Sequence, residues 1–318
     1  MDAIAQGTDI SAPGSTPRKG HLQKRFAPFL DLAPRTQKPR TSGLTMLGDR
    51  GWPLSFIRDT LEIYGYAIDI AKISIRHIHQ PEAAVRAKVE MYKEYDIETQ
   101  VGGPVIEIAR LQGNGRTALE YLVEMGFDAV EVAAEAMPTQ RDLDEEAEFV
   151  RLCVELGLRV HGEVGKKFPE GDQTRKSPRE VNVEETIRQI NNYLQAGAAN
   201  VYWEGHVLRM VLGDNGERVE GRASIEAVAK AVGLNNIIFE VPYTYLPYKS
   251  KRALQALLVY MFGPTVNVGN VLIEEIAELE EIRGGVFPAF GAPSGDHPWI
   301  ASLYRHDGHA AEEWWRGD

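Results

Sequence analysis

The stretch from residue 44 to residue 73, LTMLGDRGWPLSFIRDTLEIYGYAIDIAKI, contains the repeating unit of the fold. It opens on a short apolar run, Leu44–Leu47, and closes on a second run, Ala67–Ile73. Between them the apolar residues from Phe56 to Ile63 recur with helical spacing. The stretch therefore predicts a strand, a helix and a further strand.

The same alternation recurs along the chain. Eight apolar or β-branched runs predict strands at Leu44–Leu47, Ala67–Ile73, Ile97–Val101, Ala129–Val132, Arg159–Val164, Asn200–Trp203, Asn236–Val241 and Thr265–Val268. A helical pattern follows each run, and parallel strands need such crossovers. Eight units predict an α/β fold of one (β/α)8 barrel over residues 38–283, with an N-terminal arm at 1–37 and a C-terminal extension at 284–318. A doubly wound open sheet has a similar rhythm, but the count of eight favours the barrel.

The composition limits the classes of partner. The 318 residues include 35 Lys and Arg against 46 Asp and Glu, a formal net charge of −11. This balance argues against nucleic acid or an anionic membrane surface as a partner, because both require a basic face. The single cysteine and the lack of a long apolar run predict a soluble, cytoplasmic protein. We expect its partner to be a small anionic substrate. The aromatic extension predicts packing on a second subunit, and hence a homo-oligomer.

Two long polar connections follow predicted strands. Residues 166–176 come after the fifth strand, and residues 207–220 come after the sixth and are predicted to form a hairpin around Gly213–Gly216. In a barrel, both would rise from the carboxyl-terminal face, where active sites lie. We expect both to act as lids.

Polar residues gather at or just beyond the ends of the predicted strands. They are Asp49, Lys72, Glu107, Glu131, Glu163, Lys166, Glu204, Glu240, Asn267 and Asn270. Carboxylates this close require a counter-charge, and oxygen ligands favour Mg²⁺, or Mn²⁺, over Zn²⁺. For any single residue, a rim salt bridge such as Glu163 with Lys166, or Asp49 with Lys72, is the alternative.

A carboxylate ring beside lysines suits enolate chemistry. A metal spreads the negative charge that develops next to a carboxylate, while a lysine moves a proton at the adjacent carbon. We assign the proton transfer to Lys166 and expect Glu163 and Lys72 to be catalytic residues beside it. The predicted metal ligands are Glu107, Glu131, Glu204 and Glu240.

The histidines carry weaker signals. His77 and His79 lack a third metal ligand, whereas Arg76 with His77 directly follows the second strand and could form a cationic anion pocket. His161, inside the fifth strand, is interpreted as structural. No GxGxxG, Walker or GxSxG motif occurs in the sequence.

An ordered set of motifs between about Lys38 and Arg283 resembles the phosphosulfolactate synthase family. The pieces are Lys38-Pro39-Arg40, Gly43-Leu44-Thr45, Asp49-Arg50-Gly51, Ile68-Asp69 with Lys72, Gly102-Gly103 with Glu107, Gly126-Phe127 with Glu131, Glu163-Val164-Gly165-Lys166-Lys167, Phe239-Glu240 with Pro242, and Val266-Asn267 with Asn270. The resemblance implies a barrel enzyme, a lyase that uses Mg²⁺ to add sulfite to phosphoenolpyruvate. Lys166 would protonate the resulting carbanion. Expected substrate-binding residues are Lys38, Arg40, Asp49, Arg76, His77, His206, Arg209 and Asn267.

The sequence departs from the family pattern after four strands. The departures are Arg76-His77, Ala133-Ala134-Glu135, His206-Val207-Leu208-Arg209 and Tyr243–Pro247. Two alternatives therefore stay open. One is a diverged member acting on another anionic carboxylate metabolite, bulkier and more aromatic, as suggested by Tyr202, Trp203, His206, Tyr243 and Tyr245. The other is a non-catalytic protein like the heat-stress-associated relatives of this family.

Overall fold

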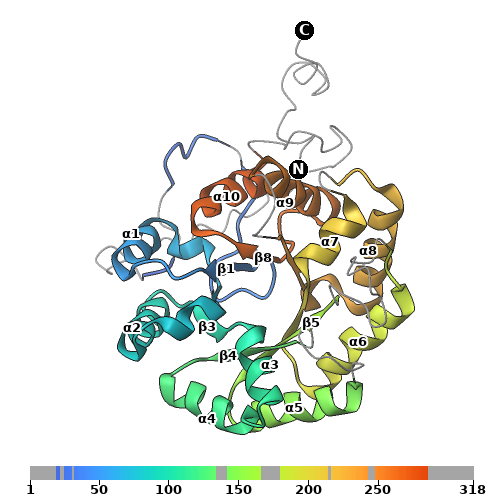
Figure 1. Cartoon of the computed structure of the whole chain (residues 1–318). Coiled ribbons are helices and arrows are strands. Elements are labelled where there is room, and N and C mark those ends of the chain that lie inside the picture. Colours follow the sequence, from blue (N-terminus) through green and yellow to red (C-terminus); the bar gives the residue numbers. More distant parts are fainter. Residues whose placement is uncertain are drawn as a thin grey trace, which may run out of the picture.

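Eight parallel strands close into a barrel in the order β1 to β8, with helices outside (Figure 1). The structure, a computed structural model, describes residues 19–21, 25–30, 32–133, 142–165, 180–213, 216–242 and 248–285, with side chains from residue 251 in the last range. The strands are β1 Thr45–Asp49, β2 Ile70–Ile73, β3 Glu98–Val101, β4 Ala129–Val132, β5 Arg159–Val164, β6 Asn200–Trp203, β7 Ile237–Glu240 and β8 Val268–Val271. The closed order confirms the (β/α)8 barrel and rules out the open sheet.

The crossovers between the strands are helical. The α-helices are α1 Leu54–Tyr64, α2 Glu82–Lys93, α3 Gly103–Leu111, α4 Gly115–Met125, α5 Leu143–Glu155, α6 Val183–Ala196, α7 Gly205–Leu212, α8 Val219–Val232, α9 Tyr248–Phe262 and α10 Ile276–Gly284. Short 3₁₀ helices lie at η1 Gly65–Ala67, η2 Ile75–His79, η3 Leu234–Asn236 and η4 Ile273–Glu275. None of the described helices is long and apolar enough to cross a membrane.

Local chemistry explains several helix boundaries. Asn182 begins α6 by accepting a hydrogen bond from the backbone N–H of Glu185 at 3.1 Å. Gly197 ends the same helix with a left-handed φ of 111°, which favours glycine at this position.

The predicted hairpin after the sixth strand is wrong. Glu204 caps α7 there, and α8 begins at Val219. Val207, Leu208, Val211 and Leu212 are buried on one face of α7. Their spacing has a period near 3.6, so it specifies a helix rather than alternating strands.

Side chains from alternate strand positions fill the barrel. Leu44, Met46, Ile70, Tyr202 and Ile238 form an inner cluster, separate from the larger apolar layer between strands and helices. Because side chains on a strand alternate with a period of two, Lys72 follows Ile70 on the inner face and Glu240 follows Ile238. Both polar side chains therefore project into the barrel near its carboxyl-terminal end.

Candidate active site

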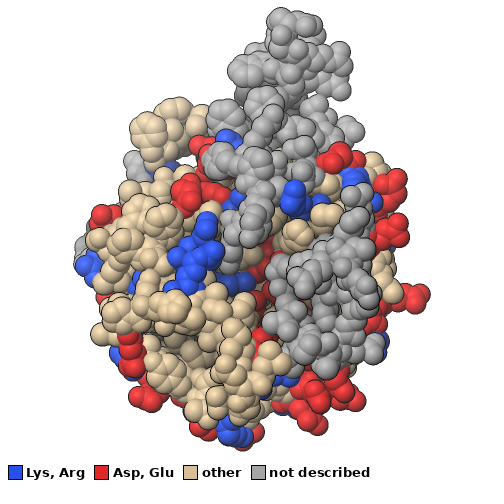
Figure 2. All heavy atoms as spheres, in the orientation of Figure 1, with Lys and Arg blue, Asp and Glu red and all other residues tan. Residues whose placement is uncertain are grey.

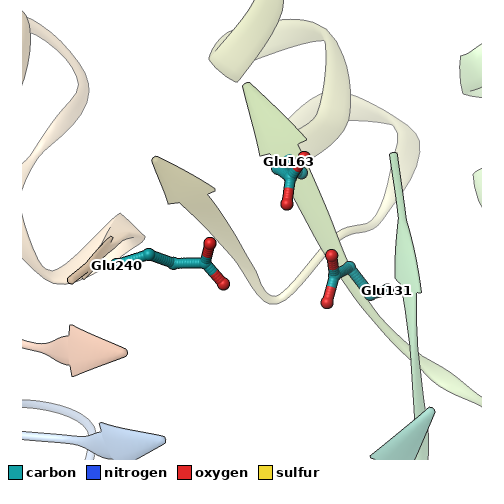
Figure 3. A group of neighbouring side chains, drawn as sticks. All are labelled: Glu131, Glu163 and Glu240. Atoms are coloured by element: carbon teal, nitrogen blue, oxygen red, sulfur yellow. The ribbon is translucent and has the colours of Figure 1, made fainter. Parts of the chain in front are cut away.

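Three buried glutamates converge near the carboxyl ends of β4, β5 and β7. Glu131, Glu163 and Glu240 each offer a carboxylate oxygen within 4.8 Å of the others. Figure 3 shows Glu240 extending from one side toward Glu131 and Glu163 on the other. In Figure 2, acidic side chains lie in a hollow near the middle of this face, with a group of basic side chains on its rim.

Lys72 supplies a positive charge to this group. Its ammonium lies 2.7 Å from Glu131 Oε2 and 2.5 Å from Glu240 Oε1, and all three side chains are almost fully buried. The same ammonium lies 4.8 Å from the centroid of the Tyr202 ring. Lys72 thus neutralises part of the charge of the carboxylate group and fixes where two of its members point.

The two carboxylates that contact Lys72 have different proton affinities. Burial opposes ionisation of Glu131, but the Lys72 ammonium and several hydrogen bonds outweigh it and hold the pKa of Glu131 below its usual value. For Glu240, burial dominates over Lys72, and the neighbouring carboxylates Glu131 and Glu204 add to it, raising the pKa to about 7. Glu131 is therefore the stable anion, and Glu240 is the group that takes a proton more easily.

Gly103 allows the helix start to approach Glu131. Its backbone N–H, at the beginning of α3, donates a hydrogen bond to the Glu131 carboxylate. A Cβ at this position would lie 2.9 Å from Glu131 Oε1 and 3.0 Å from the Ala133 Cβ. The residue was not singled out as a site residue, although the pair Gly102-Gly103 directly after a strand is the signal for such an approach.

A second buried polar group lies below the glutamates. His161 Nε2 is 2.6 Å from Glu98 Oε1, the His161 ring stacks on Tyr202 at 5.2 Å, and Tyr202 donates to Gln100 at 2.8 Å. His161 has the partner expected of a structural histidine, but its Nδ1 has no hydrogen-bond partner among the described residues. Glu98 and Gln100 were not predicted, because a glutamate at the start of a strand gives no sign that it points inward.

The other two predicted metal ligands, Glu107 and Glu204, are not members of the three-carboxylate group, although Glu204 lies close enough to Glu240 to raise its pKa. The Glu204 carboxylate accepts a hydrogen bond from the Val207 backbone at 2.9 Å and so caps α7. Glu107 is buried on α3 and is not a member of the three-carboxylate group. The described cluster is thus smaller than the predicted ring.

Asp49 and His77 lie in a separate buried network outside the barrel wall. Lys88 on α2 contacts both Asp49 oxygens, at 3.2 and 3.0 Å, and Tyr92 donates to Asp49 at 3.1 Å. Asp49 also accepts hydrogen bonds from the backbone N–H groups of Gly51 and Trp52. The suggested pairing of Asp49 with Lys72 is therefore wrong, since the last residue of β1 points toward α2.

His77 belongs to this network and is buried. Its Nε2 lies 2.9 Å from the Lys88 ammonium and 3.4 Å from Asp49 Oδ1, and its Nδ1 lies 3.0 Å from the Ser74 carbonyl oxygen. Lys88 therefore connects the segments that follow β1 and β2. His77 was expected to face an anionic substrate as a cation; instead it is buried and stabilises the segment that carries the exposed Arg76.

Three further predicted substrate contacts lie at the opposite end of the barrel. Asn267 precedes β8, where its side chain accepts from the Leu44 N–H at 2.9 Å and donates to the Ile237 carbonyl at 3.0 Å. The predicted eighth strand began three residues too early, which had placed Asn267 at the carboxyl end. Lys38 donates to the carbonyls of Tyr95 and Asp96, just before β3. Arg40 pairs with Asp69, just before β2.

The remaining predicted residues have mixed positions. Three of the predicted features lie outside the described residues: the whole polar connection of residues 166–176, which includes Lys166, and the aromatic residues Tyr243 and Tyr245. His206 and Arg209 are partly buried on α7, directly after β6. Tyr202 and Trp203 are fully buried, Tyr202 inside the barrel and Trp203 against Phe239, so neither lines an open aromatic mouth.

The fold and the buried acidic cluster define a (β/α)8-barrel enzyme whose polar centre lies at the usual carboxyl-terminal end. The sequence model of the (2R)-phospho-3-sulfolactate synthase (ComA) family matches residues 33–288. The chain therefore belongs to this family of lyase-type enzymes that form a carbon–sulfur bond.

Three relatives show how far the similarity extends. Phosphosulfolactate synthase from Methanothermobacter thermautotrophicus is 30% identical over 256 residues, covering 80% of this chain and 93% of the relative. The protein of the same name from Methanocaldococcus jannaschii is 29% identical over 77% of this chain and 92% of its own length. The phosphosulfolactate synthase from Bacillus subtilis is 26% identical over 81% of this chain and 95% of its own length.

Proposed function

We propose that this chain is a Mg²⁺-dependent phosphosulfolactate synthase, which adds sulfite to phosphoenolpyruvate. The observation that carries the proposal is the buried group of Glu131, Glu163 and Glu240 around Lys72, in a chain of this family. The names of the relatives support phosphosulfolactate as the product, and the family resemblance implies the substrate pair. With a divalent cation bound, the buried acidic centre would support chemistry in which negative charge develops beside a carboxylate.

The donor atoms fit a hard divalent cation. All three groups offer carboxylate oxygens, which Mg²⁺ and Mn²⁺ prefer, and no described sulfur or imidazole donor belongs to the group. Glu131, Glu163 and Glu240 would hold the ion. When bound, the metal would neutralise charge on the substrate carboxylate and on the carbon next to it.

The proposed reaction is an addition to a double bond. The sulfur lone pair of sulfite forms a bond to the methylene carbon of phosphoenolpyruvate, and the C=C electron pair moves to the neighbouring carbon. A proton added to that carbon completes phosphosulfolactate without a leaving group. Lys72 holds Glu131 and Glu240 in place, and Lys166, by family resemblance, delivers the proton.

The test incubates purified full-length protein with Mg²⁺, phosphoenolpyruvate and sulfite and follows phosphosulfolactate by mass spectrometry. We expect product that disappears when EDTA is added or sulfite is omitted. Lys166→Ala should lose activity, whereas Arg116→Ala, an exposed residue on α4, should retain it. Lack of product under these conditions would refute the substrate pair, and full activity of Lys166→Ala would refute the assigned proton donor.

A further inference from the structure

A polar cavity lies at the amino-terminal end of the barrel, opposite the glutamate group. Its volume is about 330 Å³, near the lower end of ligand pockets, which span roughly 300–1,000 Å³. Among its lining residues, Ile70, Glu98, Arg159 and Asn200 are the first residues of β2, β3, β5 and β6. The cavity is therefore separate from the proposed catalytic centre, which lies at the other ends of the strands.

Hydrogen-bond donors remain available in this cavity. Arg40 has a side chain only 2% exposed, and its buried Nη1 has no hydrogen-bond partner among the described residues. The Lys38 ammonium, which carries three protons, donates two hydrogen bonds to backbone carbonyls, at 3.0 and 3.3 Å. Arg159 contributes a third cation, with a side chain 61% exposed and one nitrogen on Glu98 at 2.7 Å.

The carboxylates that line the cavity already have partners. Asp69 accepts from the Thr45 N–H at 2.8 Å and pairs with Arg40 at 3.0 Å. Glu98 uses one oxygen for His161 and the other for Arg159. The third carboxylate, that of Asp96, lies 3.2 Å from His21.

The cavity thus holds a buried donor without a partner among the described residues, Arg40 Nη1, and a buried unpaired donor is costly. Burial also lowers the pKa of Lys38 to about 8, so at neutral pH it keeps a proton whose charge an anion would stabilise. We propose that this cavity is a second binding site, for an oxyanion of the phosphate type, held by Lys38, Arg40 and Arg159. Either the free ion or the phosphate group of a small ester supplies that chemistry.

Calorimetric titration of the full-length protein with inorganic phosphate and, separately, with glycerol phosphate tests the site. Arg159→Ala should weaken binding about 10-fold, because a charge-assisted contact is lost. Lys38→Met should act in the same direction, with its fold checked by circular dichroism. Tighter binding of the ester identifies a phosphorylated metabolite as the occupant, and tighter binding of phosphate identifies the free ion.

Two matched variants separate this site from other anion binding. Arg116→Ala removes another exposed arginine and should leave the affinity unchanged. Arg76→Ala removes an exposed arginine at the carboxyl-terminal end of the barrel, and so tests whether the probes bind there instead. The proposal is overturned if Arg159→Ala binds both probes as the wild type does, if only Arg76→Ala loses binding, or if neither probe binds at about 1 mM, a concentration that detects even weak sites.

Discussion

Replacement of Lys72 by methionine tests the charge balance inside the barrel. The wild-type ammonium lies 2.7 Å from Glu131 and 2.5 Å from Glu240, with all three groups buried. Removing one partner of a buried ion pair costs about 3–5 kcal/mol, because the remaining charge has no compensation. We therefore expect Lys72→Met to lower the free energy of unfolding by about that amount at pH 8.

The loss should depend on pH in a defined direction. Burial acts to raise the pKa of both carboxylates, so without Lys72 we expect their folded-state pKa values to lie above the unfolded value of 4.5. A raised folded pKa contributes stability that is fully present below pH 4.5 and is lost as the pH rises through the folded value. The variant should therefore approach wild-type stability near pH 5 and deviate most near pH 8.

Urea unfolding followed by tryptophan fluorescence, at both pH values, measures the effect. The double variant Lys72→Met/Glu240→Gln removes a negative charge together with the positive one, so it should recover part of the loss. An equal destabilisation at both pH values would contradict the electrostatic explanation and indicate a packing defect. A double variant no more stable than Lys72→Met alone would likewise contradict the electrostatic explanation.

Three other predictions concern parts of the molecule outside the glutamate group. Lys88→Met should lower the free energy of unfolding in urea by about 3–5 kcal/mol, because it leaves Asp49 buried without its cation. A loss below about 1 kcal/mol would show that the buried network around Asp49 contributes little to stability. Gly162→Ala should destabilise by about 1–3 kcal/mol, since a Cβ would lie 2.4 Å from the Tyr193 ring, and wild-type thermal stability would refute the predicted clash. Cys153 is buried and burial raises the pKa of its thiol to about 12, so a thiol reagent should label it only after urea is added; rapid labelling of the native protein would contradict this.

The strand ends show which parts of the site were predictable. Glu131, Glu163 and Glu240 were found because a charged residue near the end of an apolar strand has no place in the core unless it faces a polar centre. Asn267 was misplaced because a shift of three residues in β8 exchanges one end of the barrel for the other. The short run offered no internal marker of its register, which hydrogen bonds to β1 and β7 determine.

Contacts between distant segments could not be predicted at all. The pairing of Asp49 with Lys88 joins β1 to α2, and that of Glu98 with His161 joins β3 to β5 across the barrel. Such pairs depend on strand tilt and on which face of a helix turns inward, and neither leaves a periodic signal in the chain. For the same reason the sequence did not show that Lys38 and Arg40, expected to bind substrate, lie at the amino-terminal end of the barrel.

The sequence by itself determined the barrel, its eight units and the family, because periodicity is local and an ordered set of motifs survives divergence. Only the tertiary structure decided which polar residues share a cavity. Barrel closure places residues that are far apart in the chain within hydrogen-bond distance, as Lys72 and Glu240 show at one end. It also separates residues predicted to act together, such as Arg40 and Arg76, which lie at opposite ends of the barrel.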